Sequence, residues 1–258
     1  MDSPHFSDAW SRRVKKKLSA IAALTIALVT IWFVWGRTSS PRIPAFLAAD
    51  LPKECQQVML VLSPEAESYE ARLWLMERHW LLGWTAVSAP IQATLGRNGL
   101  AWGAGEHRSP APDGFRIKKE GDGCSPAGVF RIPFAFGTAA TGDGFKLPYT
   151  PLTPTIIGVD DPKSRFYNQI VDNAKVERDW DSNEPMIRYD KLYERGAFIA
   201  HNPAHTPGLG SCIFLHLWPG AGKSTAGCTA MSAEDLRRVL TWLDPAKEPR
   251  LVQGLQGW

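Results

Sequence analysis

The chain has 258 residues, of which 44% are hydrophobic and 21% charged, and its formal net charge is +3. The whole basic surplus lies in the first 17 residues, where Arg12, Arg13 and Lys15 to Lys17 outnumber Asp2 and Asp8. The remaining chain is therefore neutral. This excludes a nucleic-acid-binding surface that depends on excess positive charge.

An apolar segment follows this basic tail directly. Residues 18–35 contain no charged side chain, and at ~1.5 Å per residue they would form a helix ~27 Å long, close to the thickness of a bilayer core. Because the basic residues precede the segment, we expect residues 1–17 to be cytoplasmic, 18–35 to be a single-pass transmembrane anchor and the rest to be extracytoplasmic. A cleaved signal peptide is the alternative, although the exit FVWGR lacks the small residues of a cleavage site.

The remainder predicts one domain behind a linker. Residues 36–52 are rich in Pro, Ser and Ala and predict a linker, and residues 53–258 are long enough for a single core. Apolar runs predict short strands at 58–62, 69–74, 83–87, 129–134, 196–201 and 211–217. Asn98-Gly99 is typical of a tight turn. The long, weakly periodic stretch 136–195 indicates either a binding insertion or irregular surface structure.

One helix is predicted near the C-terminus. Ser232 is a good N-cap, Glu234 and Asp235 suit the helix dipole, and Leu236 and Leu240 lie on one face of a helix that ends before Asp244-Pro245. Many short strands with one soluble helix predict a mainly β domain.

The chemistry of the chain is expected at a histidine and a cysteine near the C-terminus. His216 closes an apolar strand, and Cys228 follows a glycine-rich turn. A cysteine attacks carbonyls as thiolate, and a nearby imidazole is the usual base, so we expect His216 to hold Cys228 as thiolate. The turn at Ala226, Gly227 and Cys228 offers backbone amides for an oxyanion hole.

The other candidate side chains have weaker signals. His201 could orient His216 or contact a substrate, or it could satisfy local backbone groups; Thr225 and Ser224 are possible substrate contacts. Cys212 is expected to be a small buried hydrophobe, and the pairing of Cys55, Cys124 and Cys212 is not readable from sequence. We predict no metal site, because a proline separates the two histidines of HNPAH, and no cofactor, because the phosphate-loop pattern around GAGKS is incomplete.

Three separated segments resemble the YkuD-type L,D-transpeptidases of bacterial cell walls: 95–103 (LGRNGLAWG), 120–128 (EGDGCSPAG) and 225–228 (TAGC) preceded by His216. The chain departs from the usual His-Gly and Ser-His-Gly-Cys-x-Arg pattern. Leu217 follows the histidine, Ala226 replaces the second histidine, and residues 229–231 (TAM) lack the arginine or asparagine of the pattern. The chain therefore resembles a divergent branch of that family.

The resemblance implies a mainly β, β-sandwich-like catalytic domain with a few peripheral helices. It also implies a periplasmic acyltransferase, anchored in the bacterial cytoplasmic membrane, that acts on peptidoglycan stem peptides. Cys228 would attack the diamino acid carbonyl of a tetrapeptide, release the terminal D-alanine, and pass the acyl group to a second stem as a 3-3 cross-link. His216 would serve as base and then acid. Two alternatives stay open: an L,D-carboxypeptidase or amidase that hydrolyses the same peptides, and a non-catalytic cell-wall-binding protein. The sequence does not indicate the oligomeric state.

Overall fold

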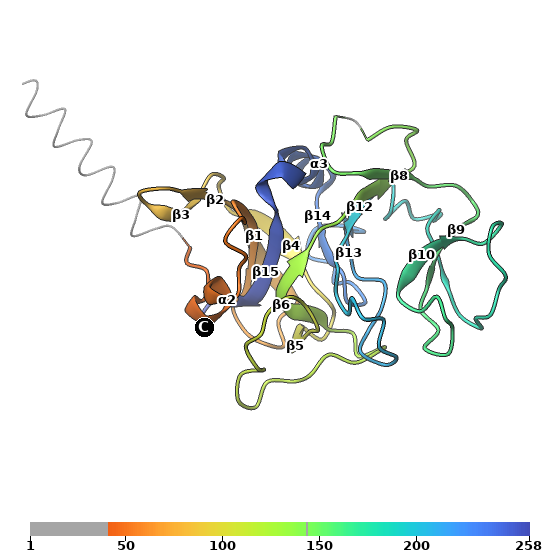
Figure 1. Ribbon diagram of the computed structural model, residues 1–258, viewed down its shortest axis with the longest axis horizontal. Helices are drawn as coiled ribbons and strands as arrows, with labels where there is room; N and C mark the ends of the chain where they lie inside the picture. The colour runs from red at the N-terminus through yellow and green to blue at the C-terminus, as the bar shows by residue number, and fades with distance from the viewer. Residues whose placement is uncertain (1–40, 143) are drawn as a thin grey trace, which may run out of the picture. The chain divides into compact units, whose positions relative to one another are not determined.

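The computed structural model describes residues 41–142 and 144–258 (Figure 1). The chain divides into two units at Arg42, and Arg42–Trp258 is the compact unit described here. The predicted basic tail, the predicted anchor at 18–35 and the first part of the predicted linker lie outside the described residues. In the part of the chain that is described, no helix is both long and apolar enough to cross a bilayer.

The described elements are mostly short strands, which confirms a mainly β fold. In chain order they are α2 (Ala45–Ala49), β1 (Gln57–Ser63), β2 (Glu70–His79), β3 (Gly83–Ala86), β4 (Ile91–Thr94), β5 (Leu100–Trp102), β6 (Ser125–Arg131), β7 (Ala135–Gly137), β8 (Tyr149–Pro151), β9 (Ile156–Val159), β10 (Gln169–Asp172), β11 (Glu184–Pro185), β12 (Arg195–Phe198), β13 (Phe214–Leu217), β14 (Thr229–Met231), α3 (Ala233–Trp242), η1 (Pro245–Lys247) and β15 (Arg250–Leu255).

Most strands belong to one mixed sheet in the order β5-β6-β15-β1-β2-β4-β14-β13-β12-β7-β8, with β3 paired to β2. Strand β1 is buried along its whole length because it lies between parallel β15 and antiparallel β2. Residues from both halves of this order, such as Leu100 and Ala197, share one apolar cluster. The Ala200 N–H donates to the Arg131 carbonyl (2.9 Å), which joins the chain after β12 to the end of β6. The sheet therefore wraps around a common core.

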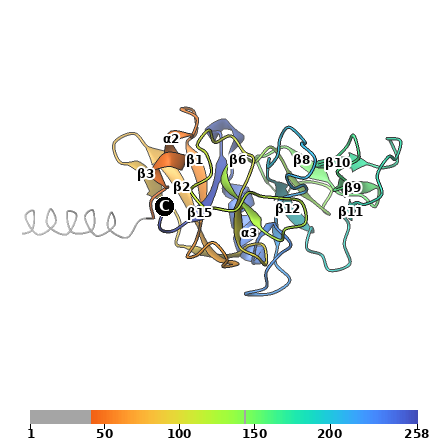
Figure 2. The same ribbon diagram turned by 90° about the horizontal axis from the view of Figure 1, so that it is seen from below.

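The long stretch 136–195 is an ordered insertion. It contributes β7 and β8 to the main sheet and forms a second sheet in the order β10-β9-β11. This small sheet has its own apolar cluster of Ile157, Val159 and Trp180. Figure 1 and Figure 2 both place it at the end of the domain opposite β3. Since it has its own sheet and apolar cluster, this stretch is a structured insertion and is not merely irregular surface structure.

Helix α3 follows the predicted pattern. The Ser232 Oγ accepts from the Asp235 N–H (3.1 Å) as an N-cap. Leu236, Leu240 and Leu243 are fully buried in the main core, so the apolar face identified in the sequence is the face that packs. These contacts place α3 directly after β14 and fix the end of the strand that begins next to Cys228.

The part of the predicted linker that the structure describes belongs to the domain. Residues 45–49 form α2, Leu47 is fully buried, and Ile43 joins the main core. The Phe46 ring packs against the rings of Trp102 (6.2 Å) and Trp258 (5.5 Å). We therefore place the beginning of the compact unit at Arg42, ahead of the predicted boundary at residue 53, because this apolar surface offsets the entropy of ordering the segment.

The turn at Asn98-Gly99 forms, but it does not join a hairpin. The Gly99 N–H donates to the Gly96 carbonyl (2.8 Å), and Gly99 has a φ of 77°. The flanking strands take different partners, since β4 pairs with β2 and β14 whereas β5 pairs with β6. The turn instead sends the chain from one part of the sheet to another, and Arg97 lies in it.

Candidate active site

The three segments that carry the family resemblance meet at the turn before Cys228. Gly96 forms a parallel bridge with Thr225, and the Arg97 N–H donates to the Thr225 carbonyl (2.9 Å). The Ser125 Oγ accepts from the Gly96 N–H (2.9 Å) and donates to the Cys228 carbonyl (3.0 Å). The Ser125 side chain thus holds the first segment and the nucleophile turn together.

Gly96 has to be a glycine at this junction. A Cβ on Gly96 would lie 2.3 Å from the carbonyl oxygen of Gly123, which is backbone and has no rotamer to change. The close approach brings the turn of the second segment against the first. The conformation of each segment therefore depends on the other.

Thr225 fixes the geometry of the nucleophile turn. Its Oγ1 donates to the Cys228 carbonyl (2.7 Å) and accepts from the Gly227 N–H (3.1 Å). The Gly227 amide, one of the predicted oxyanion donors, is therefore already bonded within the turn. Ala226, Gly227 and Ser224 line the same cavity as Cys228, as sequence reasoning expected of the turn.

The Cys228 thiol is buried at the base of the cavity, with 7% of the residue exposed. Its Sγ accepts from the Phe214 N–H (3.3 Å), and the thiol donates to the Cys212 carbonyl (3.6 Å). Burial, together with the charge of Glu184, raises the pKa of Cys228 to about 12, and the bond from the Phe214 N–H opposes this rise. The resting side chain is therefore a neutral thiol.

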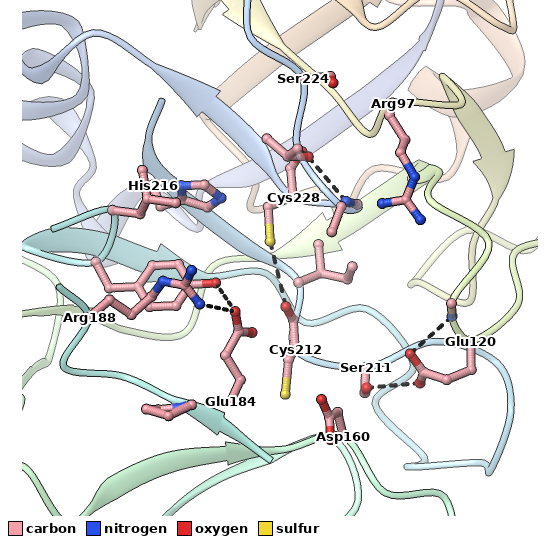
Figure 3. A pocket seen from close by; sticks show the side chains of 18 of the residues that line it. Arg97, Glu120, Asp160, Glu184, Arg188, Ser211, Cys212, His216, Ser224 and Cys228 are labelled. Carbon is pink, nitrogen blue, oxygen red and sulfur yellow. Dashed lines mark hydrogen bonds and ion pairs between the residues drawn. The ribbon is translucent and has the colours of Figure 1, made fainter. Parts of the chain in front are cut away.

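His216 lies on β13, next to β14 in parallel register, and its ring and the Cys228 Sγ point into the same space (Figure 3). The His216 Nδ1 bonds to the Leu217 carbonyl (2.7 Å). Because a carbonyl only accepts, Nδ1 carries the proton and Nε2 is left as the acceptor. Burial lowers the pKa of His216 to about 4, and the bond to Leu217 opposes this.

These pKa values do not support the expected resting thiolate. Both groups are driven to their neutral forms by burial, which disfavours the thiolate and the imidazolium alike. The arrangement instead suits general-base catalysis, in which Nε2 takes the thiol proton as sulfur attacks. The sequence could identify the pair, but it could not show the depth of burial that sets its protonation.

A cavity of about 670 Å³ opens above Cys228 and His216 (Figure 3). Its walls come from the β4–β5 turn, from the segment before β6, from the insertion and from the chain between β12 and β14. The charged side chains that line it are Arg97, Lys118, Glu120, Asp160, Glu184 and Arg188. The insertion residues among them were missed in the sequence, where only the polar run 181–184 (DSNE) marked the region.

The insertion contacts the histidine through Tyr193. The Tyr193 ring meets the His216 ring edge to face at 5.2 Å between centroids, and Tyr193 is buried. The Tyr193 hydroxyl donates to the Glu184 Oε1 (2.6 Å). Arg188 lies over the same ring at 5.4 Å and bonds to Glu184 and Asp190. The ring of His216 is thus held from two sides, by the Leu217 carbonyl and by Tyr193.

His201 satisfies backbone groups and does not line the cavity. Its Nδ1 accepts from the Ala104 N–H (3.3 Å), and its Nε2–H donates to the Leu209 carbonyl (2.8 Å). Burial lowers the pKa of His201 to about 4. With both nitrogens engaged, His201 cannot orient His216, so the second of the two interpretations of this residue agrees with the structure.

The acidic pair of the second segment divides between two roles. Asp122 orders its own turn, since it accepts from the Lys119 N–H (2.8 Å) and pairs with Lys118 (2.6 Å). Glu120 makes contacts outside its own turn, because it accepts from the hydroxyls of Tyr167 and of Ser211 and lines the cavity. It therefore ties the insertion to the chain before β13.

All four cysteines are free and buried. Cys212 is buried as expected but precedes β13 instead of lying in it; its φ is 53° and its thiol points to the Val159 carbonyl (3.7 Å). Side chains of this run alternate between two clusters, since Cys212 and Phe214 pack with Cys228 while Ile213 and Leu215 join the main core. Over residues 41–142 and 144–258, no group of three metal-ligating side chains is present.

A thiol and an imidazole on neighbouring strands of a β domain, both open to one cavity, define a candidate site for cysteine-dependent acyl chemistry. The chain belongs to the YkuD family: the model of the L,D-transpeptidase catalytic domain matches residues 69–252, which include the whole cavity. This confirms the family predicted from the three segments. It identifies the domain as an enzyme-family domain that acts on peptidoglycan stem peptides. Neither a curated protein nor a solved structure matches the chain.

Proposed function

We propose that the protein is an L,D-transpeptidase that uses Cys228 as nucleophile and His216 as general base and acid. The proposal rests on one observation above all. The Leu217 carbonyl holds the His216 Nδ1–H, which leaves Nε2 as a proton acceptor in the cavity that contains the Cys228 thiol. Family membership supplies the substrate class, peptidoglycan stem peptides.

In the acylation step the thiol proton moves to the His216 Nε2 while Sγ bonds to the carbonyl carbon of the diamino acid in a stem tetrapeptide. The carbon–nitrogen bond to the terminal D-alanine then breaks, and His216 gives the proton to the leaving amine. A thioester on Cys228 and free D-alanine result. In the second step the amine of another stem attacks the thioester, and the released sulfur recovers a proton through His216.

The negative charge of the tetrahedral intermediate has to be met by backbone donors of the nucleophile turn. The Gly227 N–H donates to Thr225 Oγ1 in the resting protein. We place the oxyanion at the turn formed by Ala226, Gly227 and Cys228. There the Gly227 N–H would leave its hydrogen bond to the Thr225 hydroxyl and donate to the substrate oxygen instead. Thr225 is thus assigned to the turn itself, and Ser224 stays a candidate substrate contact at the cavity wall.

Product analysis tests the reaction class. Incubating the full-length protein with a defined stem tetrapeptide is expected to release D-alanine and to give a cross-linked dimer of tripeptide and tetrapeptide, as measured by mass spectrometry. Cross-linked product would be absent and free tripeptide would accumulate if the enzyme were a carboxypeptidase. No change in the tetrapeptide would contradict both catalytic functions and favour a non-catalytic wall-binding protein.

We also propose that residues 18–35 anchor the catalytic domain at the outer face of the bacterial cytoplasmic membrane, within reach of peptidoglycan. Support comes from the uncharged segment and its basic N-terminal flank. A reporter that fluoresces only in the cytoplasm, fused after Trp258, is expected to stay dark. Bright cells would contradict the proposed orientation, and a domain found free in the periplasm would indicate a cleaved signal peptide instead.

A further inference from the structure

The cavity wall nearest His216 carries a carboxylate that is only half used. The Glu184 Oε1 accepts from the Tyr193 hydroxyl (2.6 Å) and from the Arg188 Nη1 (3.3 Å). Its other oxygen has no hydrogen bond within the described part of the chain. Asp160 is similar, since one oxygen accepts from the Ser182 hydroxyl (2.6 Å) and the other has no such bond in the residues described. Both residues line the cavity.

Arg188 does not neutralise this wall. Its Nε and Nη2 bond to Asp190 at 3.0 and 2.7 Å, so its main partner is Asp190 and its contact with Glu184 is the longer one. Arg188 is thus shared between the carboxylates of Glu184 and Asp190, and the charge of Asp160 adds to that of Glu184. Burial raises the pKa of Glu184, the Tyr193 hydroxyl and the charge of Arg188 oppose this, and the charges of Asp160 and Asp190 add to it. At this wall the carboxylates therefore outnumber the positively charged groups.

The location of Glu184 relates it to one step of the reaction. Through Tyr193 it is one contact away from the His216 ring. Figure 3 shows Glu184 and Arg188 on one side of Cys228, and Arg97 and Glu120 on another. Both the leaving amine and the incoming amine exchange protons with His216, so they have to lie on the side of the thioester that faces this ring. Glu184 is the carboxylate on that side.

We propose that Glu184 binds the protonated amine of the acceptor stem and so favours transfer over hydrolysis. The inference rests on the proposed transpeptidase function. The ammonium gives one proton to Glu184, which passes it to solvent, and the neutral amine attacks the thioester carbon. His216 takes a second proton from that nitrogen and returns it to the Cys228 sulfur as the carbon–sulfur bond breaks. The amide keeps the third hydrogen, so protons and electrons balance.

Water carries no charge to pair with this carboxylate, so it gains no contact of the strength that an ammonium gains. A charge-assisted hydrogen bond in a partly buried site exceeds a neutral one by enough to change a partition ratio about tenfold. Glu184 therefore determines acceptor specificity: cationic amines are selected and neutral nucleophiles are not. The contact with the acceptor amine is made only after the thioester has formed.

The variant Glu184→Gln tests the inference, since it keeps an oxygen for Tyr193 and removes the charge. Full-length protein in detergent receives a stem tetrapeptide and one of two acceptors, either an alkylamine that is protonated near neutral pH or hydroxylamine, which is mostly uncharged there. We expect the ratio of alkylamine transfer to hydrolysis to fall about tenfold. The ratio of hydroxylamine transfer to hydrolysis should stay within about twofold. Both ratios are taken per D-alanine released, so a change in the rate of thioester formation does not enter them.

The matched control is Glu177→Gln, an exposed carboxylate of the same insertion outside the cavity, which should change none of these ratios. As a second measurement, added salt should lower alkylamine transfer by the unmodified protein and leave hydroxylamine transfer unchanged. An equal fall for both acceptors, no fall for either, or no amine transfer by the unmodified protein would overturn the inference. A protein that releases no D-alanine at all would contradict the proposed function itself.

Discussion

Replacing Cys228 with alanine is expected to lower the turnover of stem tetrapeptide by about 10⁴-fold or more, because removal of a covalent nucleophile leaves only binding and oxyanion stabilisation. The residue lies in the apolar cluster with Cys212 and Phe214, and alanine removes a single sulfur, so the fold should be retained. The measurement is the initial rate of D-alanine release, together with the melting temperature.

Cys55→Ala is the matched control for this variant. Cys55 is also buried and free, but it packs in the main core outside the cavity. Its loss should cost some stability and little activity. Equal rates for Cys228→Ala and the unmodified protein would show that another group attacks the substrate.

The second large effect is on the pH dependence. Since burial lowers the pKa of His216 to about 4, the ring stays neutral and able to accept a proton throughout the mildly acidic range. We therefore expect kcat/KM to fall on the acid side only near pH 4. An imidazole with its ordinary pKa of about 6.5 would make it fall near pH 6.5. Burial raises the pKa of Cys228 to about 12, so no alkaline limb from the thiol is expected near neutrality.

Acid also lowers the stability of the fold, and this effect has to be measured separately from the effect of pH on the catalytic rate. His216 and His201 both have folded pKa values of about 4, below the unfolded value near 6.5. Between these values the unfolded chain binds protons that the folded chain does not, so the free energy of unfolding falls as the pH is lowered from about 6.5 towards 4. Rates should therefore be measured in brief acid pulses, with melting temperatures at each pH. An acid limb near pH 6.5 in a fully folded protein would contradict a buried neutral His216.

Much of the fold and the central pair could be predicted because their signals are local. A run of apolar residues at 58–62, the capping serine of α3 and the order of His216 and Cys228 are each visible within a few neighbouring residues. The segment 45–49 could not be assigned to the domain in the same way. Leu47 is buried in the core, and Phe46 packs against Trp102 and Trp258, which are far away in the chain. These contacts exist only in the folded domain.

The residues of the cavity depend even more on contacts that the local sequence does not show. Glu184 and Tyr193 lie in a stretch with weak periodicity, and their importance comes from contacts with His216 and Arg188 that depend on how the insertion packs. The sequence also predicted a resting thiolate that the pKa values of Cys228 and His216 do not support, and the reason is related. Residue order indicates that an acid and a base can meet, but the free energies of their charged forms depend on burial, which is a property of the whole fold.

Intact-mass measurement of the full-length protein after treatment with a carbapenem tests the central claim most directly, because this class of compound acylates many members of the family. We expect a single covalent adduct, located on Cys228 by peptide mapping and absent from Cys228→Ala. A protein that stays unmodified while folded, or an adduct that maps to Cys212 or to another side chain, would contradict the assignment of Cys228 as the nucleophile.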